Sequence, residues 1–123
     1  MPQRRFVILH HTLPESEHWD FMVELDYALA TWKLPAPPNG PSFLPMAAKR
    51  MDDHRKKYLV YEGPVGGNRG RVVRYDRGVA EIEHSDAQRW VVKLEGAKLT
   101  GTFVLTREGV DTDVWRLDAA RPA

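Results

Sequence analysis

Apolar and polar positions alternate along much of this chain, with the period of two residues that is typical of β-strands. The clearest case begins at Trp19, because every second residue from there to Tyr27 is apolar and the residues between them are mostly acidic. This pattern predicts a strand over residues 19–29. Two mostly apolar stretches, at residues 4–9 and 30–34, predict a strand on either side of it.

The second half of the chain predicts a series of further short strands. They are expected at residues 71–75, 79–83, 89–94, 98–105 and 113–117, with turns at residues 76–78, 85–86, 95–96 and 108–109. Many short strands at close spacing favour an antiparallel barrel or sandwich, and closure into a barrel removes exposed strand edges. We therefore expect a mainly β fold, a small closed or nearly closed antiparallel β-barrel with one short helix and long loops.

The segment between these two groups of strands is expected to be mostly irregular. Five of the nine prolines lie between Pro35 and Pro45, and proline lacks the backbone donor that strands and helices need. Residues 43–53 contain fair helix formers and predict a helix of about one or two turns, whereas residues 58–62 predict a strand. The glycine-rich residues 63–70 lack the lysine of a nucleotide-binding P-loop, so they are expected to be a flexible connection.

Length and cysteine content narrow the class of protein. A chain of 123 residues is expected to form one domain, residues 1–123, with a core that needs no covalent staples. The absence of cysteine excludes disulfides, thiolate zinc sites and cysteine nucleophiles. The apolar run at residues 6–9 is too short for a signal peptide or a membrane span, so a soluble cytoplasmic protein is expected.

Charge is nearly balanced, with 18 basic and 17 acidic residues, so composition by itself does not indicate a nucleic-acid binder. Basic side chains nevertheless gather in two segments, where they either face solvent or form a surface that attracts phosphates. The two groups are Arg50, Arg55, Lys56 and Lys57 around His54, and then Arg69, Arg71, Arg74 and Arg77.

Side chains suited to metal coordination lie at the start of the strand predicted at residues 19–29. His18 and Asp20 are two residues apart, so on a strand their side chains point to the same face. The loop at residues 12–17 is expected to fold His11 back toward them. Two imidazoles and one carboxylate suit a divalent cation with open coordination positions. A hydrogen-bonded surface histidine is the alternative interpretation of the same residues.

Several segments together resemble the 3′-phosphoesterase domain of bacterial DNA ligase D, which is found also as small free-standing proteins. The matches include His-Trp-Asp-Phe-Met-Val-Glu at residues 18–24, Ala-Thr-Trp-Lys-Leu-Pro at 30–35 and Lys-Leu-Glu-Gly-Ala-Lys-Leu-Thr-Gly at 93–101. Shorter ones lie at residues 5–8, 53–54, 61–63, 73–78 and 114–117, and at His11 and Tyr58. Because they follow the family order over nearly the whole chain, we expect a small free-standing member of this family.

The resemblance implies a β-barrel enzyme with a divalent metal, usually manganese, with zinc or another divalent ion as alternatives. It implies that His11, His18 and Asp20 bind the metal and that His54 and Tyr58 contact the scissile phosphate. The implied reaction removes a terminal ribonucleoside from DNA or RNA–DNA 3′ ends and then hydrolyses the 3′-phosphate. Implied partners are nucleic-acid 3′ ends and an end-joining ligase, polymerase or Ku-type protein, with no membrane.

The chain also departs from the pattern of the larger ligase-fused domains. They carry an arginine where this chain has Met22 and a lysine where it has Ala36, so two expected basic groups are absent. Arg50 or Arg55, close in sequence to His54, is expected to supply the phosphate-binding charge. Glu24, on the same strand face as Asp20, is expected to orient a metal ligand or a basic neighbour.

Two other functions fit parts of this pattern. The missing basic residues favour a catalytically silent module that binds DNA ends, which would show salt-sensitive binding without a changed product. His18, Asp20 and a distant His54 also mimic the two-histidine, one-carboxylate set of non-haem iron oxygenases, although the family matches outside this set argue against that class. Serine-hydrolase, dinucleotide-binding and zinc-finger motifs are absent from the sequence.

Overall fold

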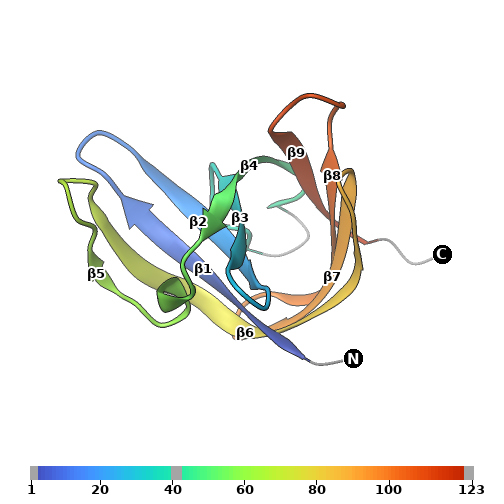
Figure 1. Cartoon of the computed structure of the whole chain (residues 1–123), viewed down its shortest axis with the longest axis horizontal. Coiled ribbons are helices and arrows are strands. Elements are labelled where there is room, and N and C mark those ends of the chain that lie inside the picture. Colours follow the sequence, from blue (N-terminus) through green and yellow to red (C-terminus); the bar gives the residue numbers. More distant parts are fainter. Residues whose placement is uncertain (1–2, 40–42, 121–123) are drawn as a thin grey trace.

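The structure, a computed structural model, describes residues 3–39 and 43–120. Gly40 and Pro41 of the predicted proline-rich loop lie outside the described residues. Nine strands and one short 3-10 helix, η2 (Lys56–Leu59), follow one another along the described part of the chain (Figure 1). The strands are β1 (Arg4–Thr12), β2 (Glu17–Glu24), β3 (Leu29–Leu34), β4 (Met46–His54), β5 (Gly63–Pro64), β6 (Arg71–Ser85), β7 (Arg89–Gly96), β8 (Thr100–Arg107) and β9 (Val114–Ala119).

All nine strands belong to one antiparallel sheet that closes on itself. The order is β1-β2-β3-β4-β9-β8-β7-β6-β5, and the additional pairing of β6 with β1 closes a barrel of eight strands. The predicted β-barrel is therefore confirmed. The two-residue β5 pairs only with the start of β6, at the end of the molecule opposite to β8 and β9 (Figure 1).

The barrel interior is filled by every second residue of the strands, as the alternating pattern requires. Trp32 lies completely buried among these side chains and meets Trp90 and Trp115 edge to face, with ring centroids 5.1 Å and 5.7 Å away. Burial of each large apolar side chain stabilises the fold by roughly 1.5–3 kcal/mol. The other large buried members are Phe6, Ile8, Phe21, Leu34, Leu94, Phe103, Leu105 and Leu117.

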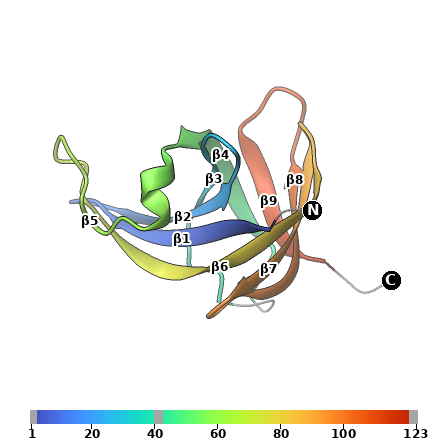
Figure 2. The ribbon, with the colours of Figure 1, turned by 60° about the horizontal axis from the view of Figure 1, so that its bottom comes forward.

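β1 and β2 are buried on their outer face as well, which creates a second and smaller apolar cluster. Val7, Leu9 and Met22 point outward from the barrel and are covered by Leu59 of η2 and by Val72. Figure 2 shows the helical turn standing over β1 and β2. This layer brings the chain from η2 to β5 close to the strands that carry the predicted metal ligands.

Two predictions between residues 43 and 62 are wrong. The predicted helix at residues 43–53 is instead strand β4, because the barrel needs this segment to pair with β3 on one side and β9 on the other. Weak helix propensity is readily overridden by such tertiary pairing. The predicted strand at residues 58–62 begins instead with the last two residues of η2, where Tyr58 and Leu59 turn back onto the outer apolar cluster.

The turn predicted at residues 76–78 is also wrong, since β6 runs through it without interruption. A Cβ atom at Gly78 would lie 1.9 Å from the carbonyl oxygen of Glu95, so glycine here serves close strand approach. The Asp76 carboxylate accepts hydrogen bonds from the backbone N–H groups of Ala97, Lys98 and Leu99, and thereby holds the next turn. That turn follows Gly96, where β7 ends, so the turn predicted at residues 95–96 is displaced.

The strand predicted over residues 19–29 is shorter than expected. It begins at Glu17 and ends at Glu24, and a turn closed by the Leu25 N–H and the Ala28 carbonyl leads into β3. In the described part of the chain, no helix is both long and apolar enough to cross a membrane.

Candidate metal centre

The hairpin of β1 and β2 places His11 directly opposite His18. Their ring centroids lie 4.7 Å apart, and Asp20 follows two residues later on the same face of β2. His11 therefore reaches this position as part of β1, through strand pairing. The turn that folds His11 back toward His18 covers residues 13–16, so the loop expected at residues 12–17 is shorter by one residue at each end.

The three side chains offer one compact set of ligand atoms. His11 Nδ1 lies 3.6 Å from Asp20 Oδ2, and His18 Nε2 lies 3.2 Å from Asp20 Oδ1. One ligand atom from each residue can be chosen so that all three lie within 4.8 Å of one another. In the described part of the chain, this is the one such group, so the alternative set of His18, Asp20 and His54 is not assembled.

The hydrogen bonds around this set fit a bound cation. His11 Nε2 lies 2.6 Å from the Arg69 carbonyl oxygen, which can only accept, so Nε2 carries a proton and Nδ1 is the nitrogen on the side of Asp20 that can bind a cation. Asp20 is only 5% exposed. Among the described residues, no lysine or arginine lies within 4.0 Å of its carboxylate. A buried carboxylate beside two imidazole nitrogens is a donor set that suits a divalent cation.

The glycine-rich segment supplies the carbonyl that orients His11. Gly70 has φ +80°, and a Cβ atom there would lie 2.0 Å from the Thr12 carbonyl oxygen. Glycine is therefore required for the loop to approach β1, and the approach brings the Arg69 carbonyl to the imidazole. The sequence predicts only a flexible connection at residues 63–70. The cluster of glycines in this segment indicates a close approach of two backbone segments, here of Gly70 to Thr12.

His11 and Asp20 form part of the floor of a cavity of about 500 Å³. His54 and Tyr58, the two predicted phosphate contacts, line the same cavity and lie with their ring centroids 6.0 Å apart. His54 Nδ1 donates to the Asp52 carbonyl oxygen at 2.9 Å, so Nε2 is the nitrogen left for chemistry. The structure thus brings the predicted ligands and the predicted phosphate contacts to one place.

Basic side chains surround this cavity. Arg55, one of the two predicted phosphate binders, lines it together with Lys57 and Arg69, which sequence reasoning did not place in the site. The Lys57 ammonium lies over the rings of Tyr58 and Tyr61, 5.2 Å and 5.5 Å from their centroids. The feature of the sequence that indicates a place in the cavity for Lys57 is its position directly before Tyr58. Asp52 and Asp53 also line the cavity, so the wall carries both signs of charge.

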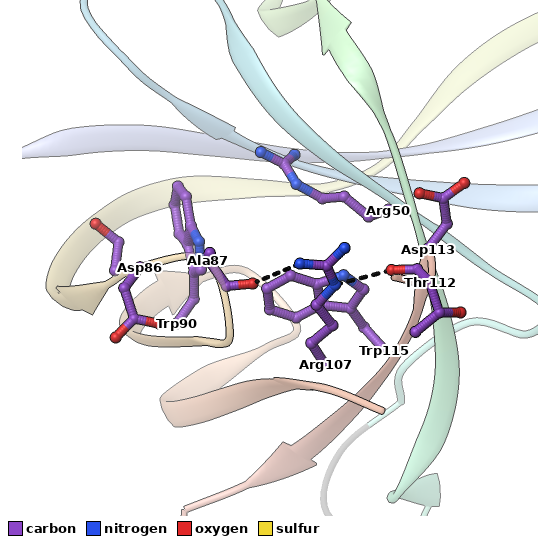
Figure 3. Close-up of a pocket in the computed structure, with 9 residues that line it drawn as sticks. Arg50, Asp86, Ala87, Trp90, Arg107, Thr112, Asp113 and Trp115 are labelled. Carbon is purple, nitrogen blue, oxygen red and sulfur yellow. Dashed lines mark hydrogen bonds between the residues drawn. The ribbon is translucent and has the colours of Figure 1, made fainter. Parts of the chain in front are cut away.

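Arg50 lies elsewhere. Its side chain points into the barrel, where the guanidinium carbon lies 4.5 Å from the centroid of the Trp32 ring, and it lines a different pocket, shown in Figure 3. On a regular strand residues 50 and 54 would share a face, but the pairing of β4 with β3 shifts by one residue between Met51 and His54, and this β-bulge places the two side chains on opposite faces. Arg50 therefore does not supply a phosphate donor to the His54 cavity in this structure.

Glu24 also lies outside the cavity lining. Its carboxylate accepts hydrogen bonds from the Arg5 guanidinium and lies 3.3 Å from the Lys56 ammonium. The Arg5 side chain, more than any other neighbour, lowers the pKa of Glu24 to about 2. Of the two roles expected for it, orientation of a metal ligand or of a basic neighbour, the contacts are those of the second. Glu24 ties Lys56, the first residue of η2, to the end of β2.

The two departures from the family pattern differ in their surroundings. Met22 is buried in the outer apolar cluster and lines the cavity next to Asp20. A side chain at this position therefore faces the cavity. Ala36 is exposed after β3 and is not part of the lining.

Comparison with known proteins gives a consistent result. A model of the family described as the DNA Ligase D 3′-phosphoesterase domain matches residues 9–107. The chain is 28% identical over 113 residues to the multifunctional non-homologous end joining DNA repair protein LigD of Mycobacterium tuberculosis, covering 86% of this chain and 15% of that protein. It is 31% identical over 99 residues to multifunctional non-homologous end joining protein LigD of Pseudomonas aeruginosa, covering 73% and 12%. The chain thus spans about a seventh of the length of these relatives.

Proposed function

We propose that this chain, which belongs to the DNA ligase D 3′-phosphoesterase domain family, is a divalent-metal-dependent phosphoesterase acting on nucleic-acid 3′ ends. One observation supports this above all. His11, His18 and Asp20 converge into a single ligand set, and the cavity that His11 and Asp20 help to line also contains His54 and Tyr58. The metal ligands lie before the proline-rich segment at residues 35–45, and His54 and Tyr58 lie after it. Only the folded chain brings these two pairs of side chains to one cavity.

His11, His18 and Asp20 would hold the cation, for which manganese is the first choice and zinc an alternative. A bound divalent cation neutralises charge on a phosphate oxygen and lowers the pKa of coordinated water. The protein's own contribution begins with the Arg69 carbonyl, which keeps the His11 ring in the tautomer whose Nδ1 can ligate. The strand pairing of His11 with His18 sets the spacing of the two rings.

His54 and Tyr58 would act on the phosphate side of the cavity. With Nδ1–H held by the Asp52 carbonyl, His54 as an imidazolium can hold the phosphate through Nε2–H or donate that proton to the leaving oxygen, which leaves the ring neutral. The Tyr58 hydroxyl can donate a hydrogen bond to a phosphate oxygen. Lys57 and Arg55 add positive charge at the rim, which favours a substrate with several phosphates over an uncharged ester.

The test uses a primer-template with a 3′-phosphate and a second one that ends in a single ribonucleotide. We expect manganese-stimulated release of phosphate or nucleoside, lowered at least about a hundredfold by Asp20→Ala and by His54→Ala. His84→Ala is the matched control, because His84 is a half-exposed histidine outside the cavity that pairs with Asp86. Full activity of Asp20→Ala, or no turnover by the wild type with any divalent metal, would refute the proposal.

The names of the relatives place those proteins in DNA end joining. We extend this role to the present chain as trimming of damaged 3′ ends before a polymerase or ligase uses them, with a Ku-type protein as a further partner. Complementation of an end-joining defect by the wild type, and its failure with Asp20→Ala, is the corresponding test.

One observation favours a second function. Met22 lies on the cavity floor where the larger ligase-fused domains carry an arginine, so one charged donor to the phosphate is missing. A protein that retains the cavity but lacks turnover would bind 3′-phosphorylated ends and release them unchanged. Steeply salt-dependent binding together with an unaltered end would identify this end-binding module.

A further inference from the structure

At one end of the barrel, the inward-facing positions of four neighbouring strands carry two arginines and two tryptophans. Each of these four residues lies two positions from a buried core residue on the same strand, so its side chain points to the same, inner face. The pairs are Arg50 with Ala48 on β4, Trp115 with Leu117 on β9, Arg107 with Leu105 on β8, and Trp90 with Val92 on β7. Together with the loops at residues 85–87 and 112–113 they enclose a pocket of about 340 Å³, shown in Figure 3. This volume lies in the range of small-molecule sites, which occur preferentially in places that include barrel mouths.

The two guanidinium groups in this pocket retain unused donors. Arg107 donates from Nε to the Thr112 carbonyl at 2.9 Å and from Nη1 to the Ala87 carbonyl at 3.5 Å, the dashed lines in Figure 3. Arg50 donates to the Thr31 carbonyl at 3.3 Å. Since each guanidinium has five N–H donors in a planar fork, both groups can still bind an anion.

The protein neutralises these two arginines only in part: Arg50 has one carboxylate partner, and Arg107 has none among the described residues. The nearest carboxylate oxygen to Arg50 is Asp53 Oδ1, 3.5 Å from Nη2, and desolvation by burial lowers the pKa of Arg50 despite this partner. In the residues that the structure describes, no carboxylate lies within 4.0 Å of the Arg107 guanidinium. A buried or half-buried cation without a close counter-ion is costly, and a bound anion removes that cost.

The two aspartates that line the pocket do not fill this role. The Asp86 carboxylate accepts hydrogen bonds from the Gln88 and Arg89 N–H groups and contacts His84, so it is used within its own turn. The backbone carbonyl of Asp113 accepts a hydrogen bond from the backbone N–H of Arg50. Its carboxylate points away from both guanidinium groups in Figure 3. Neither carboxylate therefore occupies the free donors of the two guanidinium groups.

We propose that this barrel-mouth pocket, defined by Arg50, Trp90, Arg107 and Trp115, binds a phosphate monoester. Two planar guanidinium groups are suited to the several oxygens of a terminal phosphate, and the indole walls exclude water from the contacts. The phosphate is carried either by a free nucleotide or by a 5′-phosphorylated nucleic-acid strand. The pocket shares no lining residue with the His54 cavity, so this inference does not depend on the proposed function.

Binding is measured by calorimetry and by intrinsic tryptophan fluorescence, since two of the four tryptophans line the pocket. The protein carries His54→Ala and the buffer contains EDTA, so that the metal centre does not contribute. The probes are inorganic phosphate, adenosine monophosphate, and one oligonucleotide with either a 5′-phosphate or a 5′-hydroxyl. We expect saturable binding of at least one phosphate monoester, weakened about tenfold or more by Arg107→Gln.

Arg50→Gln is expected to have the same effect, and Arg107→Gln decides the matter if loss of the Trp32 contact prevents Arg50→Gln from folding. Arg116→Gln is the matched control, because Arg116 lies on β9 beside Trp115 but its side chain is 53% exposed. Preference for the 5′-phosphorylated strand over the 5′-hydroxyl strand identifies a nucleic-acid end as the ligand, and binding of the mononucleotide alone identifies a free nucleotide. Absence of binding by every probe, or affinity unchanged in Arg107→Gln, overturns the proposal.

Discussion

The substitution Glu24→Gln tests how the outer layer is held over the metal centre. Glu24 has a mostly buried side chain, 13% exposed, and pairs with Arg5 and Lys56. These contacts lower its pKa from 4.5 to about 2, with the Arg5 hydrogen bonds as the largest cause. Since the ionised form is favoured by folding, Glu24 stabilises the native state above pH 4.5, and this stabilisation is lost as the pH falls from 4.5 toward 2.

The magnitude follows from the same values. The difference between 4.5 and about 2 corresponds to roughly 3 kcal/mol. Solvent screens part of it, because the Arg5 side chain is 60% exposed, so we expect Glu24→Gln to cost about 1–2 kcal/mol at pH 7. The cost should become small near pH 2, where about half of the wild-type carboxylate is protonated in the folded protein.

The assay is urea denaturation of wild type and variant at several pH values, and the quantity compared is the difference between their free energies of unfolding. Because wild type and variant share all other carboxylates, the effect of their titration on stability cancels in this difference. Glu83→Gln is the control, because Glu83 is exposed and has no ion pair among the described residues. Hydrogen exchange should also show faster opening of η2 in Glu24→Gln, since Lys56 loses its partner. A difference that is the same at pH 7 and pH 2 would refute the reasoning.

Three further predictions concern the site and the barrel. Gly70→Ala should destabilise the protein by about 2 kcal/mol or more in urea denaturation, because alanine disfavours positive φ and its Cβ would meet the Thr12 carbonyl. The same variant should bind manganese about tenfold more weakly in calorimetry, since the carbonyl that orients His11 moves; unchanged affinity would contradict this. Met22→Arg should raise phosphate release by about tenfold if the missing donor limits the rate, and an unchanged rate in a folded variant would exclude that explanation. Asp76→Ala should cost about 2–4 kcal/mol, since it removes the acceptor of several backbone N–H groups, and denaturation indistinguishable from wild type would show these bonds to be unimportant.

The local pattern of residues was sufficient to predict those features that depend on a single strand. Alternation in the apolar residues predicted most of the strands and the barrel class, because side chains on a strand repeat every two residues. The same geometry predicted that His18 and Asp20 share a face, and their atoms lie 3.2 Å apart. The partner strand of His11 was not readable in this way. Pairing register depends on the turn and on the buried faces of both strands.

Residues 46–54 show where local pattern fails. Their side chains are compatible with a helix, and only the neighbouring strands β3 and β9 make an extended conformation favourable. With that change, Arg50 turns into the barrel, and His54, at the end of the strand, lies in the cavity of the metal centre. The β-bulge between Met51 and His54, where the pairing with β3 shifts by one residue, thus separates two residues that the sequence places close together.

By itself, the order of residues determined that the chain forms strands, which faces of them are apolar, and that a histidine and an aspartate stand together on one strand. The tertiary structure decided which histidine joins them, which backbone carbonyl orients it, and which basic groups reach the cavity. The reason is physical. Period-two geometry acts within one strand, whereas barrel closure, strand register and the approach of Gly70 to Thr12 depend on contacts between segments far apart in the chain.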